Sequence, residues 1–94
     1  MVRAKNLVGL PVITSDASTI GKVDGTELDV DSWTVTHIRV DLTDDSARLL
    51  SLKKPFMGGI RIGLPVSNVL KVGDVVNLNV TLSQIRESPE SKAD

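Results

Sequence analysis

The 94-residue sequence contains no cysteine and no tyrosine, and its only aromatic side chains are Trp33 and Phe56. Without cysteine, the chain can form neither a disulfide bond nor a thiolate metal site, and we expect a cytoplasmic protein. With two aromatic side chains, stacking of unpaired nucleic-acid bases has little support. Val, Leu and Ile must therefore fill the interior, and the β-branched share of that set favours strands.

Basic charge and long apolar segments are scarce as well. Lys and Arg number 11 against 12 Asp and Glu, which gives a formal net charge of -1. Binding to a phosphate backbone requires a basic face, so we expect no nucleic-acid partner. No segment approaches the ~18 apolar residues that cross a bilayer, so we expect no direct membrane insertion.

Sequence signatures of catalysis and of cofactor binding are also missing. The single histidine, His37, would need an orienting carboxylate and a nearby hydroxyl to act as a catalytic base. A solvated or interfacial strand histidine is the favoured interpretation. The paired aspartates lack a third ligand at a metal-binding spacing, and the Gly58-Gly59 pair follows its lysines, the reverse of a phosphate-binding loop. We therefore expect no enzyme activity, no metal and no cofactor.

The sequence does contain the apolar–polar alternation that is typical of β-strands. The clearest segment runs from residue 33 to 42. Its inward face is expected to comprise Thr36, Ile38, Val40 and Leu42, and its outward face Val35, His37, Arg39 and Asp41. Residues 23–30 have the same period and are expected to pair with this segment in a hairpin. Further strands are expected at residues 60–64 and 76–82. The apolar run 7–13 contains Pro11, which indicates an edge strand or a bent, bulged strand.

One short helix is expected after the clearest strand, because Thr43 can cap it and Asp44 and Asp45 complement its dipole. Residues 67–70 are expected to add a single helical turn. Residues 86–94, with the sequence RESPESKAD, contain one apolar side chain, so we predict a flexible polar tail after a single domain of residues 1–85. Closing five or six short strands into a barrel removes exposed edges, and the pattern therefore predicts a small, mostly antiparallel β-barrel.

Four residues are candidates for contact with a partner protein: Trp33, Val35, Phe56 and Met57. Trp33 and Val35 are expected on the outer strand face, where an exposed tryptophan is typical of contact hot spots. The alternative for Trp33 is that it plugs one end of the barrel. Phe56 and Met57 lie in the loop KKPFMGG, where they could dock a partner or cover the core beneath them.

Several short segments resemble the PRC-barrel domain family. Leu7, Gly9 and Val12 fit the start of the family pattern, and IGKV at residues 20–23 fits its Ile-Gly-x-Val step. In the second half, KKP at 53–55 followed by glycine, PVS at 65–67 and VGD at 72–74 are similar to the stand-alone archaeal branch. The resemblance covers roughly residues 4 to 85.

This resemblance implies a six-stranded barrel with one short helix, and an adaptor function. It suggests an archaeal cell-division protein that binds SepF, the membrane anchor of the FtsZ ring, and acts at the division site through that partner. The resemblance also implies association with a second copy, as a homodimer, or with a paralogous PRC-barrel protein. The alternative is an RNA- or ribosome-associated module acting in RNA processing or ribosome maturation, against which the slight negative charge counts. A small-molecule or metal-binding barrel is the third hypothesis.

Overall fold

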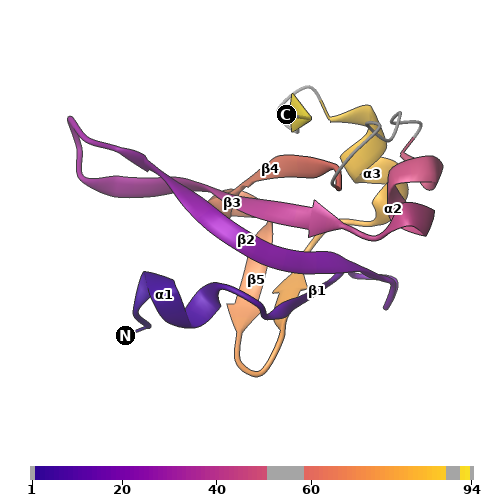
Figure 1. Ribbon diagram of the computed structural model, residues 1–94, viewed down its shortest axis with the longest axis horizontal. Coiled ribbons are helices and arrows are strands. Elements are labelled where there is room, and N and C mark those ends of the chain that lie inside the picture. Colours follow the sequence, from indigo (N-terminus) through magenta and orange to yellow (C-terminus); the bar gives the residue numbers. More distant parts are fainter. Residues whose placement is uncertain (1, 51–58, 89–91, 94) are drawn as a thin grey trace.

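The computed structural model describes residues 2–50, 59–88 and 92–93, which form one curled β-sheet with short helices at its ends (Figure 1). The strands are β1 (Pro11–Ile13), β2 (Thr19–Asp29), β3 (Thr34–Leu42), β4 (Arg61–Pro65), β5 (Val69–Val72), β6 (Val76–Leu78) and β7 (Lys92–Ala93). The helices are α1 (Ala4–Leu7), α2 (Asp44–Leu49), α3 (Leu82–Glu87) and a 3-10 turn, η1 (Val66–Asn68).

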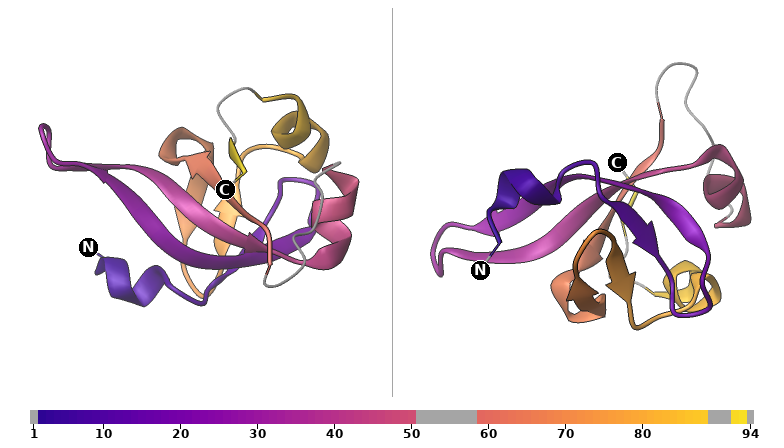
Figure 2. Two further views of the ribbon diagram at one scale, coloured as in Figure 1. Left: turned by 45° about the horizontal axis from the view of Figure 1, so that its top comes forward. Right: turned by 90° about the horizontal axis from the view of Figure 1, so that it is seen from below.

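The sheet is mixed and open. Its strand order is β5-β6-β1-β2-β3-β4-β7, and β1 pairs with β6 in parallel while the other neighbours are antiparallel. The mainly β fold is confirmed, whereas the prediction of a closed, antiparallel six-stranded barrel is only partly correct. The strands curl around the core as in a barrel (Figure 2), but β5 and β7 end the ladder without pairing with each other.

The first strand is bulged and lies inside the sheet. Pro11 is the first residue of β1, a position where its missing N–H is tolerated, and the register shifts between Val12 and Ile13. The bent, bulged alternative for this segment is therefore correct and the edge alternative is wrong. Before it, Gly9 adopts a left-handed φ of 92° and donates its N–H to the carbonyl of Val23, which holds α1 against β2.

The helix predicted after β3 is present as α2. The Thr43 hydroxyl accepts a hydrogen bond from the N–H of Ser46, and Asp44 and Asp45 occupy the first turn. The prediction of one short helix was incomplete, because α1 and α3 are also present. The strand predicted at 76–82 is shorter than expected: β6 ends at Leu78, and α3 begins at Leu82. A capping box, in which Thr81 and Gln84 satisfy each other's backbone N–H groups, starts this helix.

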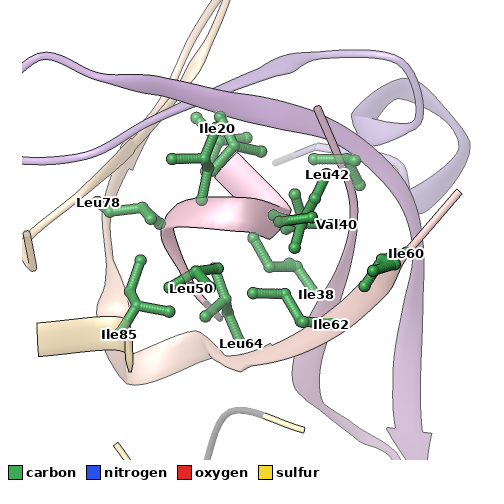
Figure 3. Close-up of a cluster of buried hydrophobic side chains, with 14 residues drawn as sticks. Ile20, Ile38, Val40, Leu42, Leu50, Ile60, Ile62, Leu64, Leu78 and Ile85 are labelled. Carbon is green, nitrogen blue, oxygen red and sulfur yellow. The ribbon is translucent and has the colours of Figure 1, made fainter. Parts of the chain in front are cut away.

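The core lies on the concave side of the sheet and is closed at one end by α2 and α3 (Figure 3). Its buried aliphatic residues are Val12, Ile20, Val23, Ile38, Val40, Leu42, Ala47, Leu50, Ile60, Ile62, Leu64, Val76, Leu78 and Ile85. Ile38, Val40 and Leu42 are among the positions that the alternation pattern assigned to the inner face. Residues 86 and 87, assigned to the tail, are the last residues of α3, and β7 pairs with β4.

Replacing Gly21 by alanine should destabilise the fold by roughly 2 kcal/mol or more, because the added Cβ would lie 2.1 Å from the carbonyl oxygen of Asp41 in the neighbouring strand. Gly25→Ala is the matched control, since a Cβ there meets no atom within 4 Å. Urea unfolding of both variants checks this. Equal loss of stability in the two would contradict the close approach of β2 and β3 at Gly21.

Candidate protein-binding surface

The β2–β3 hairpin is longer than the sheet that supports it. On one side, the β1 ladder reaches only to the pair Pro11–Lys22, and on the other the β4 ladder ends at the pair Pro65–His37. Both ladders end at prolines, and Gly9 and Leu10, which precede Pro11, extend the backbone hydrogen bonding on that side as far as Val23. We call residues 26–36 the arm: this part of the hairpin projects from the rest of the molecule, as the left-hand end of Figure 1 shows.

A β-bulge at the base of the arm sets the direction of its side chains. Thr26 pairs with Ile38 and Leu28 pairs with Val35, so β3 contributes one residue more than β2 between these pairs, at Thr36. The alternation therefore changes phase there, and Val35 lies on the same face as Ile38. The sequence pattern predicted that Val35 lies on the outward face and that Thr36 lies on the inward face together with Ile38. Because of the bulge, this prediction is wrong.

The inner face and tip of the arm are apolar and open to solvent. The exposed fractions are 46% for Leu28, 62% for Val30, 74% for Trp33 and 39% for Val35. Trp33 does not plug the barrel end, because it occupies the tip of the arm. Its φ of 55° is a left-handed conformation that costs an L-residue about 1 kcal/mol. The loop is held by Asp29, whose Oδ1 accepts the N–H of Asp31 at 2.9 Å.

The inner face of the arm continues into an apolar groove. The groove is lined by Leu7, Val35, Ile38, Val66, Val69, Val72 and Val76. Its volume is about 290 Å³, at the lower limit of ligand pockets, and each lining side chain is aliphatic. A small ligand would find no side-chain hydrogen-bonding group there to orient it. The groove suits aliphatic or aromatic side chains of a protein.

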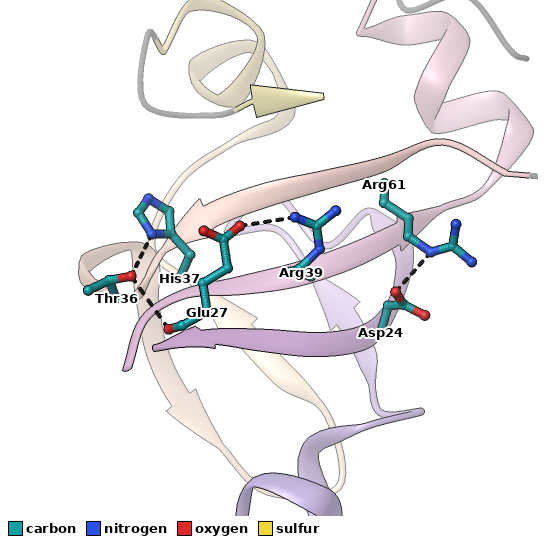
Figure 4. A network of polar contacts seen from close by, with 6 residues as sticks. All are labelled: Asp24, Glu27, Thr36, His37, Arg39 and Arg61. Carbon is teal, nitrogen blue, oxygen red and sulfur yellow. Dashed lines mark hydrogen bonds and ion pairs between the residues drawn. The ribbon is translucent and has the colours of Figure 1, made fainter. Parts of the chain in front are cut away.

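The outer face of the same hairpin is polar (Figure 4). Arg39 Nη1 lies 3.0 Å from Glu27 Oε1, and the Thr36 hydroxyl donates to the carbonyl of Glu27 at 3.4 Å. His37 Nδ1 lies 2.9 Å from the Thr36 hydroxyl, which identifies it as part of this surface network. Nearer the core, Arg61 Nε lies 2.8 Å from Asp24 Oδ2, an ion-pair distance without the angle of an N–H hydrogen bond. The arm is therefore amphipathic, with its apolar side toward the groove.

Two of the four predicted contact residues lie on the apolar surface that the arm and the groove form together. Trp33 forms the tip of the arm and Val35 joins the arm to the groove, whereas Phe56 and Met57 lie outside the described residues. Leu28 and Val30 were not predicted as contact residues, because they follow the alternation that is typical of strand residues facing a core. Within the described residues, no group of three His, Asp or Glu side chains could hold a metal ion. No helix in the described part of the chain is long and apolar enough to cross a membrane.

The chain belongs to the PRC-barrel domain family, because the sequence profile of that family matches residues 1–85. A search of curated protein sequences found no match. Membership agrees with the curled sheet and its short helices, and it specifies neither a partner nor an activity for the arm.

Replacing Trp33 by glycine should leave the stability of the dilute protein unchanged or raise it by up to about 1 kcal/mol. Glycine relieves the left-handed strain, and the exposed indole makes little contribution to folding. Ala17→Gly is the matched control, since Ala17 has a φ of 67° in the turn between β1 and β2. Thermal unfolding of both variants at low concentration measures the effect. A loss of about 3 kcal/mol in the Trp33 variant would instead indicate a packed core tryptophan.

Proposed function

We propose that this protein is a non-enzymatic adaptor of archaeal cell division that binds a SepF-like protein and is thereby linked to the FtsZ ring. The observation that carries the proposal is the arm, which holds the only tryptophan of the chain at 74% exposure on a projecting hairpin. Tryptophan is among the residues most enriched in binding hot spots. The choice of a SepF-like partner rests on the resemblance of three second-half segments, at residues 53–55, 65–67 and 72–74, to the stand-alone archaeal branch of the family.

The mechanism in this proposal is binding alone. Self-association, as a homodimer or with a paralogous PRC-barrel protein, would present two copies of each contact surface to an oligomeric partner. Two weak contacts then gain from a high effective concentration without any new interaction. The protein would act in the cytoplasm and reach the division site through its membrane-anchored partner.

The RNA- or ribosome-associated alternative receives no support from the arm. The arm, residues 26–36, contains three acidic side chains, Glu27, Asp29 and Asp31, and no Lys or Arg. A phosphate backbone would be repelled by this segment rather than attracted.

Trp33→Ala should weaken binding to the SepF homologue of the same organism by about thirtyfold, the effect of a hot-spot residue worth roughly 2 kcal/mol. Isothermal titration calorimetry with the wild-type protein and the variant measures this. The matched control is Leu49→Ala, because Leu49 is a 58% exposed aliphatic residue on α2, at the end of the molecule away from the arm. The control should bind like the wild type.

Two results would contradict the proposal. If the folded wild-type protein and the SepF homologue form no complex, a SepF-like protein is not the partner. Equal weakening by Trp33→Ala and Leu49→Ala would show that the arm is not the contact.

A further inference from the structure

We propose that the free edge of β5 receives an extended segment of a partner protein, which adds one strand to the sheet and alternates aliphatic with acidic side chains. This inference goes beyond the proposed function, and it rests neither on a SepF-like partner nor on Trp33. Strand addition takes its affinity from main-chain hydrogen bonds and its specificity from the hollows that receive alternate side chains.

β5 lies at the end of the sheet and has one free edge. It pairs with β6 on one side, and no strand of the described residues pairs with its other side. Three of its four residues, Leu70, Lys71 and Val72, are exposed. Such an edge presents unpaired N–H and C=O groups to any segment of matching length. Figure 1 shows β5 at the lower side of the molecule, away from α2 and α3.

A β-bulge gives this short strand two chemically different faces. The register shifts between Val69 and Lys71, so Leu70 is an extra residue of β5 opposite β6. Val69 and Val72 consequently lie on one face and line the apolar groove. Leu70 and Lys71 lie on the other face and border a separate hollow of about 490 Å³.

The groove would receive the aliphatic side chains of the added strand. Val69 and Val72 open from β5 into the groove, and Val35 and Ile38 of β3 line it as well. Opposite residues of neighbouring strands bring their Cβ atoms to about 5 Å, so alternate side chains of a strand beside β5 reach this groove. The added strand therefore extends the open sheet at the groove, and it leaves the tip of the arm uncovered.

The other face of β5 favours an acidic side chain. The hollow on this face contains Lys71 together with the polar side chains of Ser15, Asn77 and Asn79. Lys71 is exposed, and it forms no ion pair with another described residue. Opposite charges on neighbouring strands stabilise a sheet when they face each other. A carboxylate is therefore favoured beside Lys71, while the groove favours an aliphatic group on the opposite face.

The same residues disfavour a second copy of the chain as the occupant. Two β5 edges related by a two-fold axis would bring the Lys71 side chains of both copies close together, and like charges facing each other destabilise a sheet. A short edge strand that carries a lysine and a bulge is also protected against pairing with a whole sheet. With four residues, β5 suits a short linear segment.

A peptide titration tests the inference without assuming the identity of the partner. The probe is the acetylated and amidated peptide SVEVEVS, and the readout is the amide NMR spectrum of the isotope-labelled full chain. The peptide should shift the amide resonances of β5. Lys71→Glu should weaken its binding about fivefold, because like charges then face each other. The peptide SVKVKVS should show the reverse preference and bind Lys71→Glu about fivefold more tightly than the wild type.

Two further variants serve as controls. Arg86→Glu makes the same change of net charge on exposed α3, at the closed end of the core, and should bind SVEVEVS like the wild type. Trp33→Ala should also bind the peptide like the wild type, because Trp33 does not line the groove.

Two N-methylated forms of SVEVEVS separate strand addition from simple docking in the groove. One form carries the methyl groups on the valine nitrogens and the other on the glutamate nitrogens. Successive residues of a strand direct their N–H groups to opposite edges, and only one edge of the added strand meets β5. One form should therefore lose binding while the other keeps it.

Four results would overturn the inference. The first is the absence of any β5 shift at saturating solubility of the peptide, and the second is equal binding of SVEVEVS and SVKVKVS. The third is an equal effect of the two N-methylations, which would exclude pairing through one edge. The fourth is a β5 shift that follows the concentration of the protein alone, which would assign the edge to a second copy. None of these results concerns Trp33, so the proposed contact of the arm is tested separately by its own calorimetry.

Discussion

The candidate surface depends on one structural constraint: the β2–β3 hairpin is longer than β1 and β4, the two strands that flank it. Pro11 begins β1 and Pro65 ends β4, and neither ladder continues along the arm. The hairpin holds its own register through cross-strand pairing, but its apolar side chains toward the tip, Val30 and Trp33, are 62% and 74% exposed. A sheet that was complete to the tip would have buried Leu28 and Val35 in the core. Here the same residues form an open surface continuous with a groove.

Much of the fold could be predicted from local sequence patterns. The period of two in β3 and the Thr43 cap followed by two aspartates each correspond to an observed element. α3 was missed because the alternation from Val76 continues to Leu82. The capping-box spacing of Thr81 and Gln84 was a signal that could have found it.

The candidate surface was less accessible to sequence reasoning. Trp33 could be recognised as an unusual residue beside a local turn, but the projection of that turn beyond the sheet follows from the lengths of β1 and β4, which are non-local properties. The facing of Val35 depends on the bulge at Thr36, and a bulge between two β-formers leaves the residue pattern unchanged. Alternation alone therefore placed Val35 on the wrong face. Membership of the PRC-barrel family accounts for the fold. It does not give the role of the arm, which has to be argued from the exposure and chemistry of the arm's residues.

The central claim is that the apolar face of the arm is covered by protein in the working state, and the fluorescence of Trp33 tests it most directly. The chain has one tryptophan and no tyrosine, so its emission at long-wavelength excitation reports on the arm tip alone. Emission spectra and acrylamide quenching should be recorded over a dilution series, first of the pure protein and then with the partner added. The account predicts a hydrated, readily quenched indole at low concentration that shifts to the blue and becomes protected as complexes form. Complex formation with an unchanged, fully quenchable Trp33 would contradict it.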